Sequence, residues 1–242
     1  MTVDTTNNLS EEFAVNGFVR VPGVVEAGLL NAISLELERV ADHDKLHARG
    51  GSIYAARDVF AVNSRLLAMA SEGPLLQLAR ELAGPEARAT KATYFDKRPE
   101  ANWTLPLHQD LTITVRNRAE VPGYTHWSVK AGVPHVQPPV ALLQQIVALR
   151  LHLDDCPVEN GALEVVPGSH RQGRIGASEL RAMHLEGRAV ACPAIAGDVL
   201  AMRPLLVHGS RKAVAPGRRR VLHIEYCAAA LDAPLAWPDW CA

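Results

Sequence analysis

The sequence has few aromatic residues, almost no net charge and no long apolar run. Phe, Trp and Tyr make up 5% of its 242 residues, and the formal net charge is −1 with a pI of about 6.8. A near-neutral chain whose longest basic run is Arg218–Arg220 offers no polyanion-binding face. We therefore expect neither nucleic acid nor an anionic membrane as a partner. No apolar segment approaches the ~18 residues that a membrane span needs.

Cysteines are also scarce, and they are scattered. The four cysteines show no C-x-x-C spacing: Cys156, Cys192, Cys227 and Cys241. The polar N-terminus, MTVDTTNNLS, lacks the basic and apolar regions of a signal peptide. We therefore expect free thiols and a cytoplasmic protein.

The predicted secondary structure changes from helical to strand-like near residue 89. Before it, helices are predicted from Ser10 to Gly17, over 26–42 and from Pro74 to Gly84. After it come short strand-like runs, roughly 89–96, 107–115, 145–153, 162–166, 190–192, 198–207 and 219–227. Many short strands without intervening helices predict a β-sandwich or barrel. We expect one domain over 1–242, helical over about 1–88 and β over about 89–230.

One segment, 117–139, contains too many prolines and glycines for a regular element to be predicted. A long irregular loop in a compact domain is usually functional or disordered. We interpret it as a lid that shapes a substrate pocket, with Trp127 as a candidate contact; the alternative is an ordinary surface loop.

A histidine and a carboxylate lie two residues apart in the strand-like run LPLHQDLTITV. Residues i and i+2 of a strand share a face, so His108 and Asp110 are predicted to point the same way. His208, which closes the apolar run 198–207, offers a third ligand, and Arg219 begins the next strand. Two histidines and one carboxylate form the facial triad of non-haem Fe(II) sites. An arginine nearby can bind a carboxylate through two hydrogen bonds.

Four segments carry a family resemblance: HQD at 108–110, ENGALEVVPGSHRQG at 159–173, HGS at 208–210 and RRRVLHIEY at 218–226. In this order they resemble the phytanoyl-CoA dioxygenase family, and EEFAVNGFVRVPGVV resembles how its members begin. The resemblance implies a mainly β fold, a double-stranded β-helix (jelly-roll, cupin-like) core with N-terminal helices. It also implies iron at His108, Asp110 and His208, with Arg219 on the C5 carboxylate of 2-oxoglutarate.

The activity implied by the resemblance is that of an Fe(II)- and 2-oxoglutarate-dependent dioxygenase. Such an enzyme uses O₂ to hydroxylate or otherwise oxidise a C–H bond of a small-molecule metabolite, releasing succinate and CO₂. Related halogenases have a small residue at the carboxylate position, so Asp110 favours oxidation over halogenation. The alternative is a non-redox metal-dependent binding module or hydrolase on the same fold. Neither the substrate nor the oligomeric state follows from the sequence.

Further candidate contacts surround these ligands. Ser210 is expected to hydrogen-bond the keto acid, and Lys91 and Thr93 share a strand face that lines the pocket in the family. Arg150 and His152 alternate with leucines, in a stripe that is either solvated or directed into the lumen. We hypothesise that Arg150 binds the co-substrate or an anionic substrate. Gln109 lies between two ligands, although its strand parity is opposite to theirs.

A rival pair, His223 and Glu225, follows on the strand that begins at Arg219. If Arg219 faces the lumen, this pair does too. It lacks a well-placed third ligand, so we rank it below His108 and Asp110. The pair then consists of polar lumen residues, with His223 a candidate substrate contact.

Overall fold

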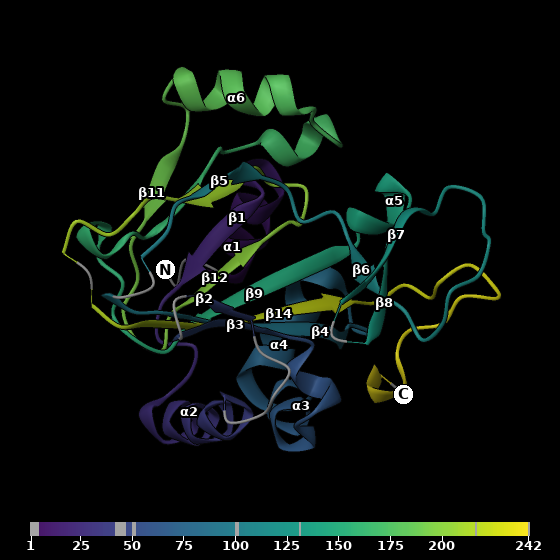
Figure 1. The fold of residues 1–242 in the computed structure, drawn as a ribbon, viewed down its shortest axis with the longest axis horizontal. Coiled ribbons are helices and arrows are strands. Elements are labelled where there is room, and N and C mark those ends of the chain that lie inside the picture. The colour runs from purple at the N-terminus through teal and green to yellow at the C-terminus, as the bar shows by residue number, and fades with distance from the viewer. Residues whose placement is uncertain are drawn as a thin grey trace.

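The computed structural model describes residues 5–41, 47–49, 52–99, 102–130, 132–215 and 217–241. A seven-stranded antiparallel sheet forms its centre (Figure 1). In spatial order its strands are β1 (Phe18–Val21), β12 (Val199–Met202), β9 (Ile146–His152), β14 (Arg219–Cys227), β4 (Arg88–Lys97), β3 (Ser52–Arg57) and β2 (His47–Arg49).

Two smaller sheets complete the β structure. The four-stranded one has the order β11 (Val190–Cys192), β10 (Leu163–Val165), β13 (His208–Ser210) and β5 (Leu105–His108). It lies against the large sheet, on the side away from α2–α4 (Figure 1). The three-stranded one has the order β6 (Ile113–Thr114), β8 (Val133–Gln137) and β7 (Thr125–Lys130).

Helices cover the other face of the large sheet. They are α1 (Thr5–Asn16), α2 (Ala27–Ala41), α3 (Ser64–Ala70) and α4 (Gly73–Ala83), while the short α5 (Val140–Leu143) and α6 (Ala177–Leu185) lie elsewhere (Figure 1). Leu222, Ile224 and Tyr226 of β14 are buried against these helices. Because strand side chains alternate, the odd-numbered residues of β14 face the small sheet instead. That inner face carries Arg219, His223 and Glu225.

The helix predictions are confirmed for two segments and wrong in one detail. α2 and α4 match the predicted ranges, with Pro74 in the first turn of α4 and Gly84 at its C-cap. Ser10 does not cap the first helix, since α1 already includes Thr5. Gly17 does end α1 with φ of +79°, and a Cβ there would come within 2.3 Å of the His170 ring. The helix α3 was not predicted.

The strand predictions place most strands but misplace several ends. The run 107–115 is divided between β5, which ends at His108, and β6. The run 198–207 contains β12, and His208 begins β13 in the other sheet instead of closing a strand. The expectation of irregular structure over 117–139 is wrong, because β7 and β8 form a hairpin there. Gly132, with φ of +80°, lies in the hairpin turn. The glycines and prolines of this segment therefore indicate turns between strands and not the absence of strands.

All four cysteines are free, as expected. Among the described residues, no helix has both the length and the apolar character that a membrane crossing requires.

Candidate metal centre

Three side chains meet between the two facing sheets. One ligand atom each from His108, Asp110 and His208 lies within 4.8 Å of the others. The histidines are brought together because β5 and β13 are neighbours, with His108 and His208 in register. Asp110 lies beyond the end of β5, where its backbone N–H donates to the carbonyl of Pro204 at 2.9 Å. The predicted strand therefore ends at His108, and Asp110 follows it in a segment without regular secondary structure, while the two side chains do point toward the same centre.

The second nitrogen of each histidine ring has a backbone partner. His108 Nδ1 lies 2.9 Å from the carbonyl oxygen of Pro106, and His208 Nδ1 lies 2.9 Å from that of Leu206. A carbonyl only accepts, so each Nδ1 carries the proton and each Nε2 keeps its lone pair. Those Nε2 atoms lie 3.9 and 3.6 Å from the Asp110 carboxylate. Both rings are thus held in the tautomer that a metal ion needs.

The electrostatics of the centre suit a divalent cation. Burial opposes ionisation of Asp110, but the rings of His208, His223 and His108 and the ammonium of Lys91 outweigh it and lower the pKa of the carboxyl. Burial lowers the pKa of His208 to about 4, against the opposing effect of Asp110. At neutral pH the set is one carboxylate with a neutral His208. Two imidazoles and a carboxylate are the donors of a facial iron triad, so the residues fit Fe(II).

The rival pair separates into two different environments. His223 Nε2 lies 3.7 Å from Asp110 Oδ2, beside the triad, and burial lowers the pKa of His223 to about 3. Glu225 instead accepts a hydrogen bond from Lys91 at 2.6 Å. Among the described residues, the ligand atoms of His108, Asp110 and His208 come close enough to hold a metal ion. This set does not include His223 or Glu225.

A cavity of 270 Å³ opens beside the triad. Besides the triad and His223, it is lined by Lys91, Thr93, Phe95, Leu105, Thr112, Leu163 and Glu225 and by residues of two charged clusters described next. Lys91, Thr93 and Arg150, which the sequence marked as candidate contacts, are all among the lining residues.

The first cluster, here called the inner cluster, consists of Lys97, Arg150 and Arg219. All three are buried, with 9%, 9% and 3% of their surface exposed. Among the described residues, no carboxylate lies within ion-pair distance of any of them, and the acidic groups that act on Arg150 are the thiol of Cys156 and the candidate ligand Asp110. Three buried cations without counter-ions are costly unless an anion joins them.

Hydrogen bonds and charges tie the inner cluster together. Lys97 Nζ donates to Ser210 Oγ at 3.0 Å, and Arg219 donates to the carbonyl of Gly161. Burial, followed by the charges of Arg219 and Arg150, lowers the pKa of Lys97 to about 7. Burial and Arg219 lower the pKa of Arg150 to about 10. The cluster therefore concentrates buried positive charge beside the cavity, and Arg150 is its member that lines the cavity.

The second cluster, here called the outer cluster, lies on the other side of His223. It consists of Arg57, Lys91, Lys130, Asp58, His135 and Glu225. Two internal contacts organise it: Lys91 pairs with Glu225, and His135 Nε2 lies 3.1 Å from Asp58 Oδ2. Arg57 and Lys130 are half-buried. Neither has a carboxylate within ion-pair distance among the residues described.

The remaining predicted contacts do not line the cavity. Ser210 and Arg219 lie behind its wall, in or beside the inner cluster. Gln109 is buried and bonds to backbone groups of Gly173, Leu205 and Ile175, which anchors the chain just before Asp110. His152 is buried, and burial together with Arg150 lowers its pKa to about 3. Trp127 packs in a separate apolar cluster.

Sequence reasoning did not single out Lys97, Arg57 or Asp58, and it included Lys130 and His135 only as part of the segment 117–139 interpreted as a lid. Lys97 could have been found, because it continues the alternating face of Lys91, Thr93 and Phe95 on β4. The other four come from β3, β7, β8 and the residue after β3, segments for which no strand was predicted.

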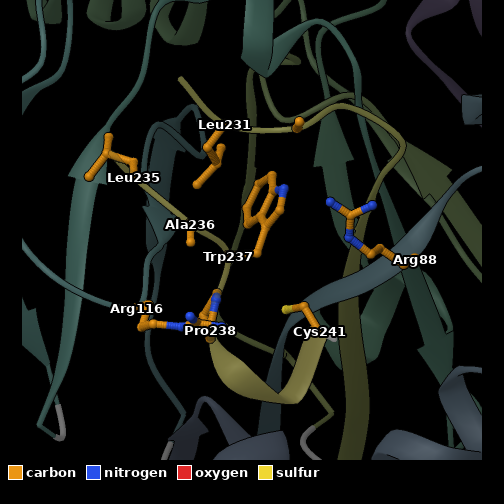
Figure 2. Close-up of a pocket in the computed structure, with 9 residues that line it drawn as sticks. Arg88, Arg116, Leu231, Leu235, Ala236, Trp237, Pro238 and Cys241 are labelled. Atoms are coloured by element: carbon orange, nitrogen blue, oxygen red, sulfur yellow. The ribbon is translucent and has the colours of Figure 1, made fainter. Parts of the chain in front are cut away.

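A second hollow, of 540 Å³, lies around Trp237, Arg88 and Arg116 near the C-terminal end of the described chain (Figure 2). It shares no lining residue with the triad cavity, and its lining includes neither histidine nor carboxylate. Arg116 is paired with Asp239 at 2.6 Å. The chemistry of the molecule is therefore concentrated in the smaller cavity.

Comparisons with known proteins give a family and a fold. The family model described as Phytanoyl-CoA dioxygenase (PhyH) matches residues 13–221. A comparison with curated protein sequences finds no match. Among solved structures, the chain is similar to the non-haem alpha ketoglutarate dependent carbocyclase SnoK from nogalamycin biosynthesis, with a TM-score of 0.70 and 18% identity over 96% of this chain and 85% of that one.

Two further solved structures contain small molecules. The epimerase SnoN, in complex with Fe³⁺, alpha ketoglutarate and nogalamycin RO, gives a TM-score of 0.68 at 20% identity over 98% of this chain and 87% of that one. EctD from S. alaskensis, with 2-oxoglutarate and 5-hydroxyectoine, gives 0.70 at 18% identity over 94% and 78%. At these identities the likeness shows the fold, and it confirms the double-stranded β-helix core with N-terminal helices.

Proposed function

The chain belongs to the phytanoyl-CoA dioxygenase family, and on that premise we propose that it is an Fe(II)- and 2-oxoglutarate-dependent dioxygenase. Its substrate is a small-molecule metabolite, of which one C–H bond is oxidised while 2-oxoglutarate is converted to succinate and CO₂. The similar structures SnoN and EctD hold alpha ketoglutarate (2-oxoglutarate), which supports the same co-substrate here.

The observation that carries the proposal is the inner cluster beside the triad. A generic metal site needs ligands but has no use for three buried cations without counter-ions. A dicarboxylate co-substrate that chelates the metal at one end presents a second carboxylate at the other. The planar guanidinium of Arg219 can donate two hydrogen bonds to that second carboxylate. Lys97 and Ser210, which are hydrogen-bonded to each other, supply further polar groups next to Arg219.

Each residue then has a stated task. His108, Asp110 and His208 hold Fe(II), which supplies the activation of O₂. The inner cluster orients 2-oxoglutarate and neutralises its distal charge. Gln109 fixes the segment that carries Asp110, and the Nδ1 contacts keep both histidines in the binding tautomer. His108 and Asp110 are partly exposed, which leaves the centre open to a substrate.

The carboxylate of Asp110 bears on the outcome of the reaction. With all three protein positions of the triad filled, no ligand position is freed for a halide, which favours hydroxylation or another oxidation over halogenation. Similar structures include a carbocyclase and an epimerase, so several outcomes can follow oxidation at a C–H bond. Ferrous iron and free thiols both fit a reducing, cytoplasmic setting.

The test is an anaerobic titration of Fe(II) and 2-oxoglutarate, followed through the weak visible charge-transfer band of the chelated keto acid. Wild type should develop the band. Arg219→Ala should need about 100-fold more 2-oxoglutarate, since truncating one partner of a buried charge pair costs about 2–5 kcal/mol. The matched control is Arg80→Ala, an exposed arginine on α4 at the far face of the large sheet.

No band in wild type with metal still bound would contradict the proposal. It would favour a metal-dependent binding module or hydrolase on this fold. An equal loss in Arg80→Ala would also count against it, because the effect would then be general and not due to the inner cluster.

A further inference from the structure

The outer cluster differs from the inner cluster in how its charges are balanced. Lys91 and Glu225 neutralise each other at 2.6 Å, and Asp58 holds His135, whose pKa is lowered by burial against the opposing effect of Asp58. Three cations face two carboxylates, which leaves one positive charge unbalanced. The excess falls on Arg57 and Lys130, which have no ion-pair partner among the residues described.

Strand register fixes where Arg57 lies relative to the metal centre. Across the large sheet, Arg150 of β9 pairs with His223 of β14, His223 with Thr93 of β4, and Thr93 with Arg57 of β3. Directly paired residues share a face, so all four side chains point toward the cavity side. His223 lies against Asp110. Arg150 and Arg57 therefore lie on opposite sides of the metal centre in a single row.

The second unpaired cation comes from a different sheet. Lys130 ends β7 and lines the same cavity as Arg57 and Lys91. Burial lowers its pKa, followed by repulsion from the charges of Lys91 and Arg57, against the opposing effect of Asp58 and Asp110. Such repulsion is relieved when an anion binds between them.

We propose that Arg57 and Lys130 form the substrate's anion site, so that the substrate is a small polar molecule bearing an oxyanion: a carboxylate, or a phosphate or sulfate ester. The assignment rests on the proposed function, because it takes the inner cluster to be occupied by 2-oxoglutarate. The substrate then lies between Arg57 and the metal, opposite the co-substrate.

Two further features limit the substrate. The cavity of 270 Å³ is at the small end for ligand sites and must also contain the co-substrate, so only a small group enters it. His135 lines the cavity, and its Nδ1 is buried without a hydrogen-bond partner among the described residues. A hydroxyl or amine on the substrate would satisfy this nitrogen, whereas a long apolar chain would leave it unsatisfied.

The experiment uses full-length protein loaded with Ni(II), which is redox-inert here, and with saturating 2-oxoglutarate, which fills the inner cluster. Sodium acetate and sodium sulfate are titrated in separate arms by calorimetry, at ionic strength held constant with chloride. Acetate represents a carboxylate, and sulfate represents a phosphate or sulfate ester. The variants are Arg57→Gln and Lys130→Gln, with Arg80→Gln as the matched surface control.

At least one anion should bind wild type and Arg80→Gln saturably and bind each of Arg57→Gln and Lys130→Gln at least tenfold more weakly. The conservative variants Arg57→Lys and Lys130→Arg should retain most of the binding, since they keep the charge. Which arm binds identifies the class of oxyanion. No saturable binding of either anion to wild type, or equal binding in all variants, would overturn the proposal.

A separate measurement tests the proposed function independently of the anion site. The visible band of Fe(II) with 2-oxoglutarate is measured on the same proteins without added anion, and Arg57→Gln and Lys130→Gln should keep it. A band in wild type with no anion binding would refute the substrate site alone. Absence of the band would refute the oxygenase, whatever the anions do.

Discussion

The two charged clusters lie on opposite sides of His223 and differ in how their charges are balanced. The inner cluster is fully buried and consists of cations with no carboxylate within ion-pair distance among the described residues. The outer cluster is partly open and has two carboxylates of its own, each with a partner. Unopposed buried charge destabilises a fold, whereas paired charge is tolerated. In the proposed function the bound co-substrate balances the charges of the inner cluster, whereas most charges of the outer cluster balance one another.

The largest expected effect concerns folding. In Glu225→Gln the largely buried ammonium of Lys91 loses its negative partner at 2.6 Å and keeps its hydrogen bond to the Thr112 carbonyl, and the free energy of unfolding should fall by about 3 kcal/mol. Arg150→Met, which removes one of several like charges, should lower it by less than about 1 kcal/mol or raise it. Urea unfolding of the protein without metal and co-substrate measures both. Because Lys91 also affects Asp110, the double variant Lys91→Met/Glu225→Gln serves as control and should recover part of the loss.

The second effect concerns co-substrate binding, where a variant of the inner cluster should have a larger effect than a variant of the outer cluster. Arg150→Met should weaken 2-oxoglutarate by about 30-fold or more, since a buried cation near the distal carboxylate is lost. Arg57→Met, on the other side of His223 in the same row, should change it less than about twofold. The visible-band titration compares them. Similar losses in the two variants would mean that the clusters are not separate sites.

The third effect is a pH dependence that belongs to the inner cluster alone. Lys97, whose neighbours are Arg150, Arg219, Cys156, Trp103 and Ser210, has a pKa lowered to about 7 before an anion binds. A carboxylate binds the protonated ammonium and raises this pKa. The gain is complete below pH 7 and shrinks as pH rises above 7, by up to about tenfold per pH unit.

The matched variants for this dependence are Lys97→Arg and Lys97→Met. The arginine keeps its charge throughout, so 2-oxoglutarate affinity should stay high and nearly flat between pH 6.5 and about 8.5. The methionine variant should be flat and weak. If the slope persisted in both, another group would have to be responsible.

The smallest effect is expected outside both clusters. Trp127 packs with an apolar cluster on the three-stranded sheet, with the guanidinium of Arg118 5.6 Å from its ring centre. Trp127→Phe should therefore leave the affinities for 2-oxoglutarate and for the anion probes within about twofold of wild type. A larger change in anion binding alone would show that the β7–β8 hairpin transmits its packing to Lys130.

Several parts of the fold follow from local patterns. The helices α2 and α4 were predicted from apolar spacing and from Pro74 and Gly84, because those signals act within one turn of chain. The hairpin of β7 and β8 was missed, because its prolines and Gly132 were taken to exclude strands. Its stability comes from pairing with β6, which no short window of sequence contains.

The sequence by itself determined the ligand types and their order, from His108 to Arg219, and the alternation that turns Arg219, His223 and Glu225 toward one face. Only the tertiary structure decided that a backbone hydrogen bond to Pro204 holds Asp110, that Lys97 joins Arg219, and that Arg57 lies two strands from His223. The physical reason is that a period of two residues fixes which face a side chain takes. Which strands become neighbours, and in what register, depends on packing between segments far apart in the chain.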